Sequence, residues 1–110
     1  MGLDTIQTAL LTVGTPVSHY NAVEQPDKYI VWAEDGQADA VHGDNRMQTQ
    51  ALTGTVDYFT KVEYDANVQK IQKALSDAKI PWRLESIQYE DETKYIHHEF
   101  VWEIAVNPYG

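Results

Sequence analysis

The amino-acid sequence predicts an α+β domain: an antiparallel or mixed sheet of about five strands with two helices packed on one face, in the order α-β-β-β-α-β-β. Two segments, residues 3–13 and 65–79, repeat apolar side chains at helical spacing. The other apolar segments are rich in aromatic and β-branched residues and alternate in polarity, as strands do. These strand segments follow one another in runs of three and two, which favours antiparallel or mixed pairing.

The composition is that of one folded domain spanning residues 1–110. Hydrophobic residues make up 43% of the chain, which is enough for one layered core at this length. The 17 acidic side chains outnumber the 8 Lys and Arg, and the formal net charge is −9. This charge repels nucleic-acid phosphates and argues against a sequence-reading DNA or RNA binder. The sequence has no cysteine, which excludes disulfides and thiolate chemistry and suits folding in the cytoplasm.

The first elements are a short amphipathic helix and two strands. The apolar stripe of the helix consists of Leu3, Ile6, Leu10 and Val13. Gly14 and Pro16 end this helix. We interpret residues 17–20 (VSHY) as a short strand and residues 28–34 (KYIVWAE) as a central strand, because the latter is apolar on both faces.

A polar segment at about residues 35–46 then interrupts the strands. It combines glycine with Asp and Asn and has no sustained periodicity, so we expect a long flexible loop or a hairpin tip. Loops of this length in so small a domain are usually either functional or disordered. The candidate docking residues in this segment are Asp35, Asp39, His42, Asp44 and Arg46. The alternative is an inert hairpin tip.

The third strand, residues 47–61, runs almost directly into the second helix. Asp65 is predicted to cap this helix. Its apolar stripe consists of Val68, Ile71, Leu75 and Ala78. Pro81 prevents the helix from continuing. Residues 82–90 and 94–106 are then predicted to form the two strands of a hairpin.

No pattern in the sequence points to catalysis, so we predict a non-enzymatic protein without metal or cofactor. On a strand, His97 and Glu99 share a face and His98 points away, so the adjacent histidines cannot chelate one ion together. The acidic loop lacks calcium-ligand spacing, because Gly36 directly follows Asp35. No serine lies in a nucleophile elbow, and no glycine-rich phosphate loop is present. An enzyme that uses His97 and Glu99 is kept as an alternative.

Membrane insertion and secretion are not predicted. No apolar run approaches the roughly 20 residues that span a membrane. The N-terminal stretch MGLDTIQTALLTVG has no basic region of the kind that begins a signal peptide. We therefore expect a chain without a leader and without a membrane partner.

The chain resembles the tail terminator proteins of long-tailed bacteriophages and prophages, also called tail-to-head joining or tail completion proteins. The residues that carry the resemblance are 56–61 (VDYFTK), which match the usual strand end of that family: hydrophobic, Asp, hydrophobic, aromatic, Ser or Thr, and Lys. A helix that opens with YDANVQKIQKAL follows directly, and an aromatic hairpin ends the chain. The resemblance covers nearly the whole sequence.

The resemblance implies a non-catalytic virion protein at the tail–head junction, made and assembled in the bacterial cytoplasm. Such a protein forms a ring, expected to be a hexamer, that caps the finished tail tube, ends its polymerisation and joins it to the head connector. Its partners are copies of itself, the major tail tube protein and the head connector or completion protein. DNA passes through the lumen without sequence-specific binding, which agrees with the acidic composition.

The third strand has a second face that suits such an assembly. Leu52, Gly54, Val56 and Tyr58 form one face, and Thr53, Thr55, Asp57 and Phe59 form the other. Because a ring requires one patch to dock on a different patch of the next copy, the second face is the predicted subunit or tail-tube interface. The alternative is that it meets water.

Other roles stay open for the whole chain. The segment at residues 35–46 is expected to order on docking to the tube or the connector. The alternatives to a tail terminator are another head–tail connector or minor tail protein, or a small non-catalytic bacterial α+β binding domain.

Overall fold

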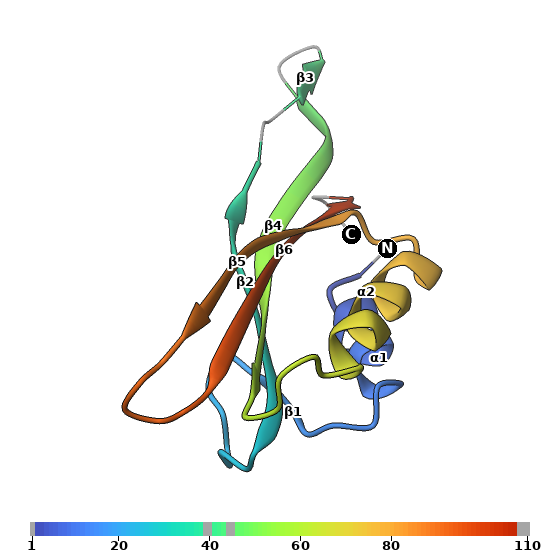
Figure 1. The fold of residues 1–110 in the computed structure, drawn as a ribbon. Coiled ribbons are helices and arrows are strands. Elements are labelled where there is room, and N and C mark those ends of the chain that lie inside the picture. The colour runs from blue at the N-terminus through green and yellow to red at the C-terminus, as the bar shows by residue number, and fades with distance from the viewer. Residues whose placement is uncertain (1, 39–40, 44–45, 108–110) are drawn as a thin grey trace.

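Two helices pack on one face of a mixed sheet in the computed structural model, which describes residues 2–38, 41–43 and 46–107 (Figure 1). In chain order the elements are α1 (Asp4–Leu11), β1 (Val17–His19), β2 (Lys28–Gln37), β3 (Val41–Gly43), β4 (Arg46–Thr60), α2 (Asn67–Asp77), β5 (Trp82–Tyr89) and β6 (Ile96–Val106). The strand order is β1-β2-β4-β6-β5, and β3 pairs with β4. The β1–β2 pair is parallel and the others are antiparallel, so the sheet is mixed.

The predicted α+β class and the order of its elements are confirmed, with one added strand. The described residues of the segment at 35–46 lie at the end of a β2–β4 hairpin, because the two strands pair as far as Gln37 and Leu52. Within it, residues 35–37 belong to β2, and β3 pairs back onto β4. Figure 1 shows this hairpin extending well beyond the helices. It therefore has no layer to bury against and needs no apolar alternation, which explains why the sequence pattern indicates a loop there.

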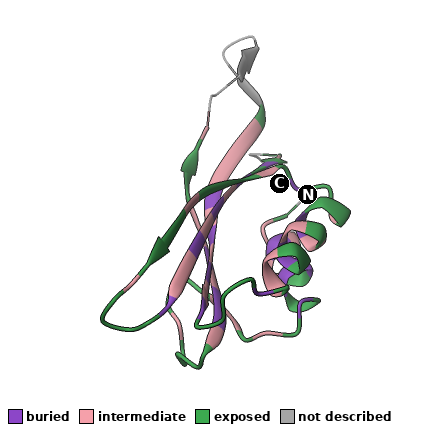
Figure 2. Ribbon diagram, in the orientation of Figure 1, coloured by how far each residue is buried: buried purple, intermediate pink, exposed green. Residues whose placement is uncertain are grey.

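The core lies between the two helices and the sheet face that they cover (Figure 2). The helices contribute Ile6, Ala9 and Leu10 from α1 and Ile71 and Leu75 from α2. The sheet contributes Ile30, Trp32, Val56, Tyr58, Phe100, Trp102 and Ile104. These positions repeat every second residue along β2, β4 and β6, as the two-residue period of a half-covered strand requires.

The α2 helix begins and ends close to the predicted boundaries. Its N-cap position is Ala66, one residue later than predicted, but the Asp65 carboxylate still accepts the N–H of Asn67 at 2.9 Å. Lys79 takes a left-handed φ of 61° after the last turn, and Pro81 follows. In the part of the chain that the structure describes, neither helix is long and apolar enough to cross a membrane.

Candidate functional site: the open face of the sheet

The sheet face opposite the helices is the candidate functional surface, because no described helix covers it (Figures 1 and 2). It carries the four predicted interface residues Thr53, Thr55, Asp57 and Phe59, each half-buried by its neighbours. Val56 and Tyr58, which alternate with them, are fully buried under the helices. The predicted separation of the two faces is confirmed, and the contact that the open face makes stays a prediction.

Aromatic rings form a row across three strands of the open face. Tyr29 of β2 stacks on Phe59 of β4 with ring centroids 4.7 Å apart, and Phe59 stacks on the His97 ring of β6 at 4.3 Å. Tyr95 meets Tyr29 edge-on at 5.5 Å. The Tyr95 hydroxyl donates to the backbone carbonyl of Pro26 at 2.6 Å. This row gives the open face a rigid apolar floor and ties the loop before β2 to it.

His97 and Asp57 form a polar pair beside this row. The His97 Nε2 lies 2.7 Å from the Asp57 Oδ1, and both side chains are about one-fifth exposed. The hydrogen bond to Asp57 raises the pKa of His97, although burial by itself lowers it. His97 therefore holds a proton more readily than a free histidine does. Glu99 lies opposite Asp57 on the neighbouring strand and accepts the Ser86 hydroxyl at 3.3 Å.

The adjacent histidines face opposite surroundings, as the strand alternation predicts. His98 lies on the helix side of the sheet and is 9% exposed, and its Nδ1 has no hydrogen-bond partner within the described structure. Burial lowers the pKa of His98, which therefore stays neutral more readily than His97. Among the described residues, no group of three His, Cys, Asp or Glu is arranged to hold a metal ion, and this includes the surroundings of the His97–Asp57 pair.

Two open hollows border this surface. The first has a volume of about 290 Å³ and is lined by Tyr20, Asn21, Ala22, Gln25, Tyr29, Val31, Asp57, Phe59 and His97. The second, of about 430 Å³, is lined by Asp35, Thr53, Gly54, Pro81, Trp82, Arg83, Val101, Trp102 and Glu103. Small-ligand sites enclose most of their ligand, whereas these hollows open widely to solvent. The open face is better suited to contact with another protein.

The predicted docking segment is described only in part. Asp35 lies at the exposed end of β2, and its Oδ1 accepts the Thr53 hydroxyl at 3.3 Å, so it joins the open face. His42 lies in β3 and Arg46 begins β4, where the sequence predicts a loop. The remaining two residues, Asp39 and Asp44, lie outside the described residues. The docking role of the segment stays a prediction.

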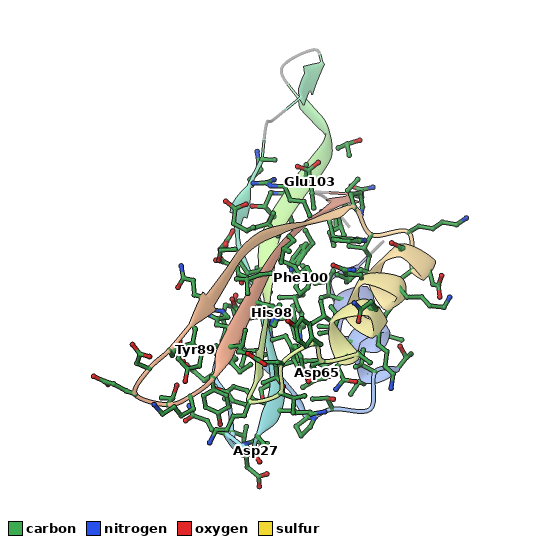
Figure 3. All side chains as sticks on the ribbon, in the orientation of Figure 1. Asp27, Asp65, Tyr89, His98, Phe100 and Glu103 are labelled. Atoms are coloured by element: carbon green, nitrogen blue, oxygen red, sulfur yellow. The ribbon has the colours of Figure 1, made fainter. Side chains whose placement is uncertain are left out.

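A buried polar network centred on Asp65 is not predicted from the sequence. The Asp65 carboxylate accepts the hydroxyls of Tyr58 and Thr60, both at 2.6 Å, and the Lys28 Nζ lies 3.5 Å away. Asn67 of α2 donates its amide to the Tyr58 hydroxyl at 3.1 Å. Figure 3 shows Asp65 between the sheet and α2. The network joins the end of β4 to the start of α2, and a polar residue next to a helix start is the only sequence signal for it.

The network shifts two pKa values in opposite directions. Burial by itself raises the pKa of Asp65, but the hydrogen bonds from Thr60 and Tyr58 outweigh burial and lower it. Burial, with the hydrogen bond to Asp65, raises the pKa of Tyr58 to about 12. At neutral pH the network therefore consists of a carboxylate held by protonated donors.

This fold recurs in solved structures. A chain of the structure "Virion of native gene transfer agent (GTA) particle" matches with a TM-score of 0.61 and 14% sequence identity, covering 93% of this chain and 91% of that chain. A second solved protein matches with a TM-score of 0.57 and 14% identity, covering 100% of this chain and 99% of that chain. At these identities the likeness establishes a shared fold. No protein-family model matches the sequence, and no curated protein matches it either.

Proposed function

We propose that the chain is a structural subunit of a phage-like virion that caps the tail tube, ends its polymerisation and joins it to the head connector. The observation that carries this proposal is the fold shared, over nearly the full length of both chains, with a chain of a gene transfer agent virion. A fold by itself does not define a function. The strand end at residues 56–61, with the helix directly behind it, supports the specific role of a tail terminator.

The proposed assembly is a hexameric ring with DNA passing through its lumen. The net charge of −9 opposes binding to phosphates, so a polyanion can move through such a ring without being held. A closed ring requires two different contact patches on each subunit. The subunit offers an uncovered sheet face and two unlike sheet edges, β1 and β5, from which to build them.

The open face is the proposed contact with the tail tube or with a neighbouring subunit. Besides its row of aromatic rings, this face carries hydroxyl and carboxylate groups at Thr53, Thr55 and Asp57, which can bond to a partner strand or side chain. The end of the β2–β4 hairpin extends beyond the helices, where it can reach the tube or the head connector (Figure 1).

Electron microscopy of tails assembled with and without this protein tests the function. With the protein present, we expect tails of uniform length that are joined to heads. In its absence, we expect tails of uncontrolled length without heads. If tails made without the protein have uniform length and lack only the heads, the protein belongs to the connector instead. Normal, head-bearing particles made without the protein would contradict the proposal.

The oligomeric state provides an independent test. Light scattering after size-exclusion chromatography, and co-sedimentation with purified tail tubes, should show a ring of several copies. A chain that stays monomeric at millimolar concentration and does not bind the tubes would contradict a terminator ring.

A further inference from the structure

We propose that the exposed side of β5 is the surface on which the next copy of the chain packs, and that this next copy contributes the outer face of α2. The inference rests on the proposed ring and identifies its subunit contact. It commits to a second copy of this chain as the occupant.

The β5 strand leaves an apolar stripe uncovered at one edge of the sheet. Among the described strands it pairs only with β6. Leu84, Ile87 and Tyr89 lie on the helix side of the sheet, since Leu84 pairs with the buried Phe100 and Ile87 pairs with His98. Yet these three side chains are 40%, 57% and 58% exposed. We call them the β5 stripe.

The subunit's own helices stop short of the β5 stripe. Trp82, at the start of β5, is held by α2, because its indole N–H donates to the Ser76 hydroxyl at 2.8 Å. The strand then leads away from the helices, and Figure 3 shows Tyr89 at its far end, distant from α2. Three large apolar side chains in a row on a sheet edge are typical of a protein contact surface.

The edge of β5 is not suited to pairing with another strand. A bulge interrupts its register between Leu84 and Ser86, and the Arg83–Glu85 ion pair of 2.8 Å lies at the same point. Bulges and charges on an edge strand block strand-to-strand pairing. The β5 stripe is therefore expected to receive side chains from a helix rather than to extend the sheet.

Charge identifies α2 as the helix of the next copy that fits the β5 stripe and the turn after it. The turn after β5 carries Asp91 and Glu92, both exposed and without a cationic partner in the part of the chain that the structure describes. The outer face of α2 displays Lys70 and Lys73, both exposed, whereas α1 has no cation. Lysine stems are apolar and can cover the β5 stripe while their ammonium groups reach the carboxylates of the turn.

The two surfaces lie on opposite flanks of one subunit. In Figure 1 the β5–β6 turn is at the far left and α2 is at the right, so the two cannot meet within one chain. A contact between unlike flanks of successive copies is head-to-tail, the kind from which a ring is built when the rotation between copies closes. It also leaves the open face of the sheet free to meet the tail tube.

Paired charge reversal tests the contact. One variant carries Lys70→Glu with Lys73→Glu, and the other carries Asp91→Lys with Glu92→Lys. All four side chains are exposed. The first variant loses the Lys73–Asp77 ion pair, but a surface ion pair contributes little to stability. Both variants should therefore fold normally, as measured by circular dichroism. Each alone should assemble at least tenfold more weakly than the wild type. Mixed one to one, they should recover assembly, because each reversed flank then meets a flank of opposite charge.

The β5 stripe is tested separately. Ile87→Ser with Tyr89→Ser should weaken association at least tenfold while the melting temperature stays close to that of the wild type. Val23→Ser is the matched control, because Val23 is 88% exposed on the loop before β2 and lies outside both surfaces. Its association should equal that of the wild type.

The outcomes separate this inference from the proposed function. Wild-type assembly by each charge-reversed variant would show that the ring forms through other surfaces. A mixture that stays dissociated, or that yields only dimers, would show that the two flanks do not meet head-to-tail. A wild-type protein that never assembles, even with tail tubes added, would contradict both the proposed function and this inference.

Discussion

At the residue scale, Asp65 connects sequence, fold and stability most directly. Its carboxylate lies 3% exposed at the junction of β4 and α2 and is held by two hydroxyls, one backbone N–H and a lysine. A buried charge is tolerated only when such partners satisfy it. The lowered pKa of Asp65 shows that the partners outweigh the cost of burial.

Replacing Asp65 with Asn should lower the free energy of unfolding by about 1–3 kcal/mol at pH 7, because buried donors lose a charged acceptor. Since the folded pKa of Asp65 lies below its ordinary value of 3.8, this stabilisation is present above that pH and is lost as pH falls through the folded pKa. Urea unfolding should therefore show a smaller difference in unfolding free energy between the wild type and Asp65→Asn at pH 3 than at pH 7. The control is Asp77→Asn, at a side chain 65% exposed.

The two adjacent histidines should titrate on opposite sides of the ordinary value of 6.5. The raised pKa of His97 means that its pairing with Asp57 stabilises the fold below pH 6.5 and is lost as pH rises through the folded pKa. The lowered pKa of His98 means that its neutral burial becomes costly as pH falls below 6.5. Imidazole NMR titrations measure both values.

Asp57→Asn distinguishes the causes of these two shifts. It should return the pKa of His97 toward 6.5, because the carboxylate is the main cause of its rise, and leave the pKa of His98 below 6.5. A wild-type protein in which both histidines titrate above 6.5 would contradict the burial of His98.

At the element scale, β4 requires a glycine at position 54, and no pattern in the sequence indicates this requirement. The alternation of residues 52–59 predicts a side chain on the core face at position 54. A Cβ there would lie 2.1 Å from the Ala33 carbonyl oxygen and 2.2 Å from the Trp102 ring. The Trp102 indole crosses this point and donates to the Thr55 carbonyl at 3.0 Å. Glycine is required because the ring and the neighbouring backbone already fill the space.

Gly54→Ala should therefore destabilise the protein by about 1–3 kcal/mol, since neither the backbone nor a packed tryptophan can move aside easily. The matched control is Gly36→Ala on the neighbouring strand, where the nearest atom to a new Cβ is the Thr53 hydroxyl at 3.8 Å. Its effect should stay within about 0.5 kcal/mol. Equal unfolding free energies for the two variants would contradict the packing of Trp102.

The elements that the sequence predicts well are those with one covered face. The apolar stripe of α2 and the alternation of β6 both appear in the structure, since each element packs one side on the core. The end of the β2–β4 hairpin is predicted as a loop because it packs on neither helix. The β5 strand is predicted in place, but the sequence does not indicate that its apolar stripe stays exposed.

At the scale of the whole molecule, charge sets what the proposed ring can do with DNA. With a net charge of −9, the free protein should not retain double-stranded DNA in a mobility-shift assay at physiological salt. A basic DNA-binding protein in the same assay is the control. Retention of DNA at a dissociation constant tighter than about 10⁻⁴ M, in the range of ordinary non-specific binders, would contradict passive passage.

The sequence by itself determined the α+β class, the order of the elements and the separation of the two faces of β4. These follow from local periodicity, because each element must bury one side. The tertiary structure alone decided that Asp57 meets His97, that Tyr58 and Thr60 hold Asp65, and that the β5 stripe stays uncovered. Such contacts depend on strand register and on how far the helices reach across the sheet, and neither quantity is encoded in the pattern of a single element.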